Sequence, residues 1–386
     1  MEFETEAVLQ SKCVMCQGDT VYKRIVIKVG SNLLTDEKGI KKSFMKSFVS
    51  QLFDLHEKGR EIIVVSSGAI SMGVKKLRMN KKPTALSEKQ AVAAVGQIVL
   101  MQAYEEAFCE KGVSVAQVLL EHDDIKNKTK NINARNTIHK LLEWKVIPVI
   151  NENDTIATDE IKFGDNDTLA GIVGNLVDAD LVVILTSVDG IFDKNPDLHG
   201  DAKIIEEIED VAAAIKMIDT VGRTSMGTGG MVTKLEVARK LNQVGIPLVI
   251  ANGNREGVIG AIAAGKKQGT IIKSKNVKID TKKRYILMSL KEKGRIKIDD
   301  GAKNALLNMG KSLLAVGVTS VSGEFAFGDA VEIIGADNGK VGKGIVNYSS
   351  ADLNGIKGKK NAEIGKLAGE NFYEEVIHRD NLFIFK

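Results

Sequence analysis

Residues 24–32 read RIVIKVGSN, and this stretch decides the fold. Ile25–Val29 is apolar apart from Lys28, which is typical of a strand buried on both faces. Gly30 follows at once, so an ammonium group and bare backbone N–H groups meet at the end of the strand, an arrangement that suits phosphate. A lysine that merely extends past a turn into water gives the same pattern. This stretch alone leaves both interpretations open.

Further short apolar segments predict strands on the C-terminal side of this one; they are Ile62–Val65, Val113–Val118, Val146–Ile150, Leu181–Leu185 and Ile246–Ile250. Amphipathic helical patterns lie between them, with one face formed by Phe44, Phe48, Leu52 and Leu55 and another by Leu235, Ala238 and Leu241. Alternating strands and helices predict an α/β fold, a mostly parallel sheet sandwiched between helices. Ligands of such sheets bind beyond the carboxyl ends of the strands.

The pattern changes near residue 280, where short segments separated by glycine suggest a small β-rich domain. The expected strands are Arg284–Leu290, Gly294–Ile298, Ala330–Ile334 and Val341–Val346, with one helix at Ala302–Met309. The polar run Lys273–Lys283 is the expected linker, with few contacts across it. We therefore expect an N-terminal extension (1–22), an α/β domain (23–278) and a β-rich domain with a C-terminal tail (283–386).

The composition is that of an ordinary globular protein, with 386 residues, 44% hydrophobic and 27% charged. No apolar run approaches the ~20 residues of a membrane helix, and Glu2, Glu4 and Glu6 do not fit a secretory signal. We expect a cytoplasmic protein without a membrane partner. Its net charge of +4 is weak support for nucleic-acid binding, which usually shows a concentrated basic face.

The cysteines and histidines predict no metal site. Cys13 and Cys16 have the spacing of half a zinc site, but the only other cysteine is Cys109, and a closed site needs four ligands. The five histidines are scattered without the spacing of metal ligands.

Two polar loops follow predicted strands and suit a small polar substrate. Ser66–Ile70 combines two serines with glycine, which allows a carboxylate to approach the backbone, although a turn with a serine N-cap looks similar. Asn151–Asp154 places four hydrogen-bonding side chains in a row, which also occurs in structural loops.

Two further segments precede or open helices and suit phosphate chemistry. Gly164–Asp167 carries two acids around an asparagine, more than helix capping requires. Gly227–Lys234 combines three glycines with a lysine at a helix start, without the spacing of a Walker A loop. Two lysines, a carboxylate and glycine-rich loops suit phosphoryl transfer, which depends mainly on alignment and charge neutralisation.

Five motifs resemble, in this order, those of the amino acid kinase family. They are KVGSNLLT (28–35), VVSSGAISMG (64–73), NENDTI (151–156), FGDNDTLA (163–170) and GTGGMVTK (227–234). The resemblance covers about Arg24 to Ser274, and the C-terminal part resembles a PUA domain. It implies an αβα sandwich and ATP-dependent phosphorylation of the side-chain carboxylate of glutamate, the first step of proline synthesis, with Mg²⁺ and with proline as an inhibitor. We also expect a homo-oligomer, a dimer or tetramer.

The resemblance also implies roles for single residues. Lys28 and Lys234 would stabilise the transferred phosphoryl group, and Asp167 would hold both lysines. Glutamate would be bound by Ser67, Gly68, Asp154 and Asn166. ATP would be contacted by Lys28, Gly30, Thr186, Ser187, Thr228, Gly229, Gly230, Met231, Val232, Thr233 and Lys234. Ser187 stands where family members usually carry aspartate, so a hydrogen-bonding group is kept at this position but a charge is lost.

Two alternatives remain. A related kinase would act on aspartate, N-acetylglutamate, UMP or carbamate, and NENDTI together with the appended domain argues against it. An RNA-binding protein acting through the C-terminal domain belongs to a different class, and the scarcity of aromatic residues there argues against it.

Overall fold

Strand β1 (Arg24–Val29) lies in the middle of an eight-stranded sheet in the computed structural model of the protein. The structure describes residues 22–37, 39–121, 127–156, 166–194, 196, 198–221, 228–274, 281–368 and 373–385. The extension with Cys13 and Cys16, residues 164, 165 and 227, and most of the expected linker lie outside these ranges.

The large sheet has the order β5-β6-β4-β1-β7-β9-β10-β8. All neighbours from β5 to β9 are parallel, and β10 runs antiparallel to β9. The predicted mostly parallel sheet is therefore confirmed. Its other strands are β4 (Glu61–Val65), β5 (Val115–Leu120), β6 (Ile147–Glu152), β7 (Leu181–Thr186), β8 (Glu207–Ile208), β9 (Leu248–Asn252) and β10 (Thr270–Ile272).

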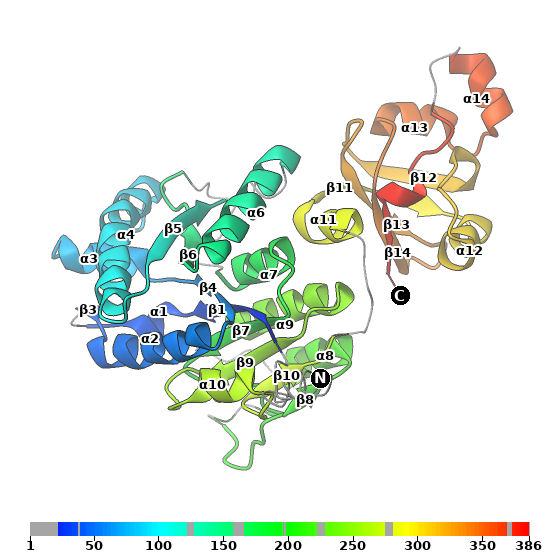
Figure 1. Ribbon diagram of the computed structural model, residues 1–386. Coiled ribbons are helices and arrows are strands. Elements are labelled where there is room, and N and C mark those ends of the chain that lie inside the picture. Colours follow the sequence, from blue (N-terminus) through cyan, green and yellow to red (C-terminus); the bar gives the residue numbers. More distant parts are fainter. Residues whose placement is uncertain are drawn as a thin grey trace, which may run out of the picture.

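Helices cover both faces of the sheet (Figure 1). They are α1 (Ser31–Leu34), α2 (Lys42–Glu57), α3 (Ala69–Lys76), α4 (Leu86–Cys109), α6 (Lys128–Glu143), α7 (Asn166–Leu176), α8 (Val211–Val221), α9 (Thr228–Gln243) and α10 (Val258–Ala263). Strands β2 (Thr35–Asp36) and β3 (Gly39–Ile40) form a separate hairpin. The predicted helical faces on α2 and α9 are confirmed, since both contribute to the core.

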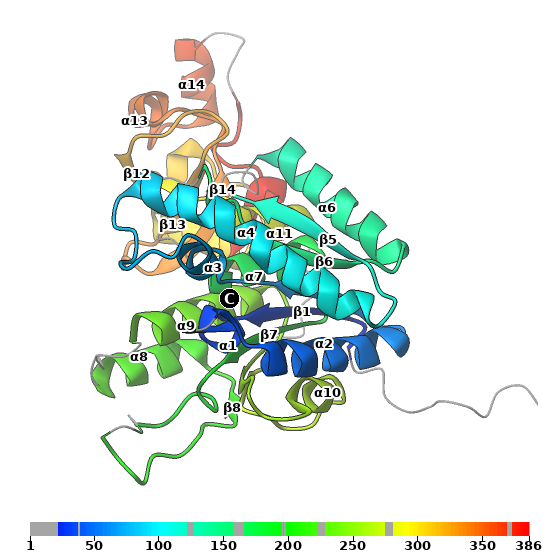
Figure 2. The same cartoon turned by 90° about the vertical axis from the view of Figure 1, so that its left-hand side faces the viewer.

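Successive side chains of β1 contribute alternately to two apolar cores, one on each face of the sheet. Ile25 and Ile27 pack with α2, α4 and α10, whereas Val26 packs with α6, α7, α8 and α9. Figure 2 shows α2 and α10 on the same side of β1 and β7. Because successive side chains of a strand point to opposite faces, Lys28 shares the face of Val26. The lysine is thereby directed toward α7 and α9.

Helices α3 and α4 approach each other closely through two glycines. A Cβ atom at Gly96 would lie 1.7 Å from the carbonyl oxygen of Ala69, and one at Gly73 would lie 1.9 Å from that of Val92. No other residue type fits at this distance, so glycine sets the spacing between the two helices. The contact fixes the start of α3, which directly follows the Ser66–Gly68 turn.

Several predicted strand boundaries are displaced by one or two residues. Strand β5 covers 115–120 instead of 113–118, and β9 covers 248–252 instead of 246–250. Strand β6 continues to Glu152, so Asn151 and Glu152 belong to the strand and the polar loop begins at Asn153. Helix α9 begins at Thr228, so much of the expected glycine-rich loop is its first two turns.

The C-terminal domain is a five-stranded sheet with the order β12-β11-β13-β14-β15, which confirms the predicted β-rich domain. Its elements are β11 (Glu292–Ile298), α12 (Asp300–Met309), β12 (Val318–Gly323), β13 (Ala330–Ile334), β14 (Lys340–Ile345), α13 (Ser350–Ile356), α14 (Asn361–Ala368) and β15 (Leu382–Ile384). A separate apolar core fills it. No helix among the described residues is long and apolar enough to cross a membrane.

The segment Arg284–Leu290 is not a strand, because Thr281–Ser289 forms helix α11. Short apolar runs do not distinguish strand from helix by periodicity, and here packing decides. Ile286, Leu287 and Met288 are buried in the core shared with α7 and α9, together with Phe383 of β15. Arg284 also pairs with Asp178 of the large domain at 2.8 Å. The expectation of few contacts at this boundary is therefore wrong, since α11 packs against both domains.

Candidate active site

The carboxyl ends of β1, β4, β6 and β7 surround a cleft of about 330 Å³, which we call the catalytic cleft. Residues predicted from all five motifs and from the Thr186–Ser187 segment line it: Lys28, Gly30, Ser67, Gly68, Asp154, Asn166, Thr186, Ser187 and Lys234. The structure therefore brings together segments up to about 200 residues apart in the chain, at the sheet edge where ligands bind in such folds.

Asp167 bridges two lysines in this cleft. Lys28 Nζ lies 2.6 Å from Asp167 Oδ1, and Lys234 Nζ lies 2.8 Å from Asp167 Oδ2. The lysines come from β1 and α9 and the carboxylate from the first turn of α7. One carboxylate thus holds two ammonium groups at a common position and leaves an excess of positive charge.

The ionic state of Asp167 follows from its surroundings. Burial disfavours its charged form, but the attraction of Lys28 and Lys234 outweighs burial and holds the pKa of Asp167 below its ordinary value. The carboxylate is therefore ionised at neutral pH. Because all three side chains are at most 13% exposed, the charges act on a bound ligand with little screening by solvent.

Asn166 organises the opposite part of the cleft. Its Nδ2 lies 2.8 Å from the Ser66 carbonyl oxygen, 2.8 Å from Ser67 Oγ and 3.0 Å from Asn151 Oδ1. Its Oδ1 atom is buried and has no hydrogen-bond partner among the described residues. An unsatisfied buried oxygen costs about 1–3 kcal/mol, so this atom is suited to accept a hydrogen bond from a ligand.

A polar network behind Asn166 fixes its position. Asn151 donates to Gln97 Oε1 of α4 at 2.8 Å, and Ser66 Oγ lies 3.0 Å from the hydroxyl group of the fully buried Tyr104. Gly68 follows with φ = 108°, a conformation that favours glycine. This turn directs Ser67 and the start of α3 toward the cleft.

Asp154 is a partly buried carboxyl group in the cleft wall. Burial raises its pKa to about 6, because no cation among the described residues pairs with it to offset desolvation. A ligand that carries an ammonium group would supply the missing charge. Asp154 and the acceptor oxygen of Asn166 together make this part of the cleft suitable for an amine.

The sequence matches known families over both domains. Residues 23–252 match the amino acid kinase family, and residues 294–367 match the PUA domain. The chain belongs to the amino acid kinase family. It is 44% identical to a glutamate 5-kinase of Caldanaerobacter subterraneus subsp. tengcongensis over 94% of this chain and 98% of that protein. It is 43% identical to a glutamate 5-kinase of Geobacter metallireducens over 94% of this chain and 97% of that protein.

Solved structures of more distant proteins also match. The UMP kinase of Bacillus anthracis is 16% identical, with a TM-score of 0.46, over 65% of this chain and 96% of that chain. The UMP kinase of Ureaplasma parvum is 18% identical, with a TM-score of 0.47, over 65% of this chain and 99% of that chain.

The residues predicted to contact the nucleotide are described in part. Gly30, Thr186 and Ser187 line the cleft, while Met231 packs against the core. Thr228, Gly229 and Gly230 form the first turn of α9, and the side chain of Thr228 lies outside the described part of the structure. Asp189, two residues beyond Ser187, is paired with Arg255 and Asn252, so it is engaged away from the cleft.

Sequence reasoning did not single out Gln97 and Tyr104 of α4, or Asn151 as a distinct contributor. Gln97 and Tyr104 lie in the middle of a long helix, where polar and aromatic side chains are common. The available signal was Gln97 itself, a polar residue directly after Gly96. Glycine inside a helical pattern often marks close packing or a functional contact.

Proposed function

We propose that the protein transfers the γ-phosphoryl group of ATP to the side-chain carboxylate of L-glutamate, forming L-glutamyl 5-phosphate and ADP. The observation that carries the proposal is the position of Asp167 between Lys28 and Lys234, 2.6 and 2.8 Å from their ammonium groups, in a cleft shared with Asp154 and Asn166. The near full-length similarity to glutamate 5-kinases supports the same activity.

The reaction needs little covalent help from the protein. A carboxylate oxygen of glutamate attacks the γ-phosphorus, the bond from that phosphorus to the β,γ-bridging oxygen breaks, and its electrons remain on ADP. The glutamate side chain is already ionised at neutral pH, so no general base is required. Alignment and neutralisation of negative charge are the remaining demands.

Lys28 and Lys234 meet the second demand. Both ammonium groups are held by Asp167, so they need no rearrangement when charge develops on the transferred oxygens. Asp167 acts as a positioning residue in this scheme. Gly30, Thr186, Ser187 and residues 228–234 would contact the nucleotide.

Mg²⁺ would accompany ATP and neutralise its β- and γ-phosphates. The described residues contain no group of three or more His, Cys, Asp or Glu side chains arranged to hold a metal ion. We therefore assign no protein ligand to the ion and route no step through it.

Glutamate would bind with its α-ammonium group at Asp154 and Asn166 Oδ1. The raised pKa of Asp154 and the unpaired oxygen of Asn166 are both relieved by a cationic donor. Ser67 and the backbone at Gly68 would bind a carboxylate. N-acetylglutamate lacks the ammonium group and would leave Asp154 unpaired, so it should be rejected.

Proline carries an ammonium group and a carboxylate and would compete at the same position, through the Asn151–Asp167 region. Proline should raise the apparent KM for glutamate, and an unchanged apparent KM would contradict this part of the proposal.

We also propose that the protein is a homo-oligomer and that it acts in the cytoplasm. Sedimentation would test the first statement and cellular localisation the second.

In the decisive assay, the protein is incubated with ATP, magnesium and one phosphoryl acceptor at a time: glutamate, aspartate, N-acetylglutamate, carbamate or UMP. ADP release should require glutamate, and added hydroxylamine should trap the acyl phosphate as a hydroxamate. Preference for another acceptor would favour the related kinase activities over this one.

A further inference from the structure

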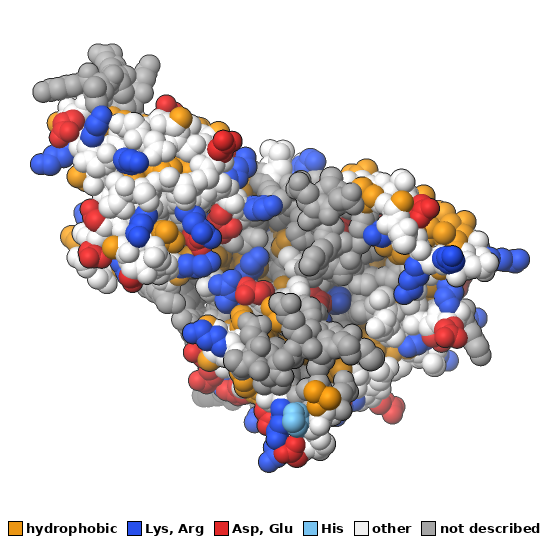
Figure 3. Space-filling view, turned by 180° about the vertical axis from the view of Figure 1, so that it is seen from behind, with side chains coloured by type: hydrophobic (Ala, Val, Ile, Leu, Met, Phe, Trp, Pro, Cys, Tyr) orange, Lys and Arg blue, Asp and Glu red, His pale blue; other side chains and the backbone are white. Residues whose placement is uncertain are grey.

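A second, larger cleft of about 860 Å³ lies between the two domains. We call it the interdomain cleft. Its walls are formed by α7 and α9 on one side, by α11 at the back, and by β11, β13 and β14 on the other side. From behind, the two domains meet across a hollow with Lys and Arg side chains on the side of the smaller domain (Figure 3).

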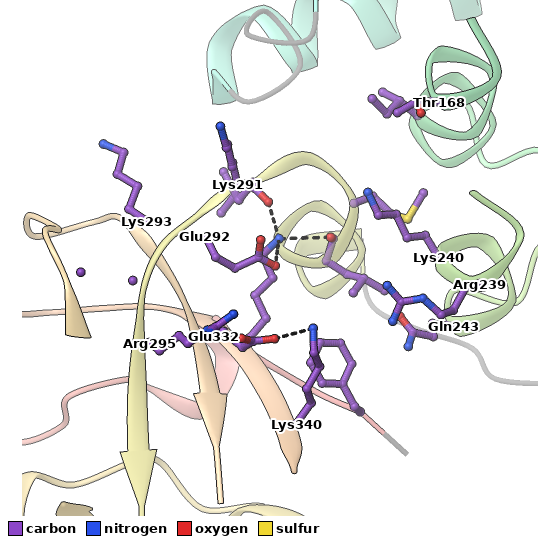
Figure 4. A pocket seen from close by; sticks show the side chains of 18 of the residues that line it. Thr168, Arg239, Lys240, Gln243, Lys291, Glu292, Lys293, Arg295, Glu332 and Lys340 are labelled. Carbon is purple, nitrogen blue, oxygen red and sulfur yellow. Dashed lines mark hydrogen bonds and ion pairs between the residues drawn. The ribbon is translucent and has the colours of Figure 1, made fainter. Parts of the chain in front are cut away.

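The charges that line this cleft are mostly positive. Two of its residues are acidic, Glu292 and Glu332. Seven are basic: Arg239, Lys240, Lys291, Lys293, Arg295, Lys340 and Lys343. Figure 4 shows Arg239 and Lys240 on α9, and Lys291, Arg295 and Lys340 on the side of the smaller domain.

Some of these cations already have partners. Glu332 accepts from Arg295 at 2.8 Å and from Lys340 at 2.7 Å. Arg239 pairs with Glu236 along α9, and Lys293 pairs with Asp329. Glu236 and Asp329 each offset one cation, whereas the single carboxylate of Glu332 is shared by two.

Lys240 and Lys291 differ, because no ion pair to either is found among the residues that the structure describes. Lys240 is close enough to affect the ionisation of both Glu292 and Lys343. Lys343 is 3% exposed and pairs with Glu292 at 2.9 Å. Burial lowers its pKa, an effect that Glu292 opposes. The cleft thus concentrates positive charge without an equal number of acids.

The lining also includes apolar surface from Ile172, Leu287, Met288, Leu290 and Phe385. A basic rim over an apolar floor fits a ligand with a charged end and an apolar or ring-shaped body. The volume lies within the range of about 300–1,000 Å³ usual for small-molecule sites.

The interdomain cleft is connected to the catalytic cleft by two helices. Lys234 and Lys240 lie on the same helix, α9. Thr168, which lines the interdomain cleft, directly follows Asp167 on α7. A ligand that moved α9 against α7 would therefore change the position of Lys234 relative to Asp167.

We propose that the interdomain cleft binds a small ligand whose phosphate group lies at the basic rim and whose apolar part lies on the apolar floor, and that its occupancy alters turnover through α9. The effect on turnover rests on the proposed kinase function, whereas binding does not.

Binding is tested with inorganic pyrophosphate by calorimetry, with the catalytic cleft saturated by glutamate and a non-hydrolysable ATP analogue in excess magnesium. We expect one further equivalent to bind. Lys240→Gln combined with Lys291→Gln should weaken this binding at least about tenfold, because two charge-assisted contacts are lost. Lys46→Gln combined with Lys58→Gln is the matched control, since both lysines are exposed on or beside α2 and should leave binding unchanged.

Three results would overturn the proposal: no binding with the catalytic cleft saturated, equal binding by both double variants, or a structured RNA that binds this cleft where pyrophosphate does not. Turnover is measured separately at saturating ATP and glutamate, where competition at the catalytic cleft does not change kcat. Pyrophosphate should change kcat of the unmodified protein but not of the Lys240/Lys291 variant. Binding without any change in kcat would refute the effector role, and absence of kinase activity would instead refute the proposed function.

Discussion

Gly171 of α7 packs so closely on Val237 of α9 that a Cβ atom at Gly171 would lie 2.6 Å from Val237 Cγ1. The contact lies one turn beyond Asp167 on α7 and about one turn beyond Lys234 on α9. It therefore sets the distance between the two helices that position Asp167 and Lys234. Valine is stiff in a helix, so its side chain cannot move aside to make room.

Gly171→Ala should push α7 and α9 apart and lower kcat by roughly ten- to a hundredfold, the scale expected for small misplacement of reacting groups. Adding Val237→Ala removes the clashing methyl group and should restore much of the rate. Gly260→Ala on α10 is the matched control, because nothing lies within 4 Å of a Cβ atom there. Equal activity of Gly171→Ala and Gly260→Ala would show that the helix spacing does not matter.

Asp154 should give the reaction an acid limb. Its pKa is raised to about 6 without substrate, and only the ionised form attracts the α-ammonium group of glutamate. We expect kcat/KM for glutamate to fall as pH drops through about 6. Asp154→Asn should have a much lower kcat/KM that no longer changes across this range. An unchanged acid limb in Asp154→Asn would assign it to another group.

The Asp154 carboxyl group should lower the free energy of unfolding at neutral pH when no substrate is bound. Because its folded pKa exceeds the ordinary value of 3.8, the folded state binds the proton more tightly, and this group's contribution to stability falls as pH rises from about 4 to about 6. Asp154→Asn should therefore raise the melting temperature of the substrate-free protein at pH 7 while lowering activity. A lower melting temperature at pH 7 would contradict the assigned environment.

Helix α11 should matter to the stability of the large domain. Ile286 is fully buried in the core that includes α7 and α9, so Ile286→Ala should destabilise the protein by about 2–5 kcal/mol. We propose that a large domain ending at Lys278 lacks part of its core. A chain ending at Lys291 should melt at a higher temperature than one ending at Lys278. Equal melting temperatures would show that α11 does not stabilise the large domain and that the domain ends at the polar linker, as the sequence predicted.

Features that depend on residues close together in the chain could be predicted from the sequence. The apolar run of β1 with Lys28 near its end, and the polar and glycine-rich motifs that carry Asp167 and Lys234, are local patterns, and the structure brings these three side chains together. Contacts between distant elements were not predictable. Gly96 lies within a regular helix, and only its packing on Ala69 explains it. The segment that became α11 carries residues that suit a strand, and packing between two domains overrides that preference.

The central claim is that Lys28 and Lys234, held by Asp167, stabilise phosphoryl transfer to glutamate. The most direct measurement is the rate of glutamyl hydroxamate formation by Lys234→Ala, with exposed Lys46→Ala as the control and melting temperatures recorded for both. We expect Lys234→Ala to lose on the order of a hundred- to a thousandfold in kcat, as on removal of one electrostatic stabiliser, and to remain folded. Lys28→Ala and Asp167→Ala should behave alike. A folded Lys234→Ala variant with a rate near that of Lys46→Ala would contradict the account.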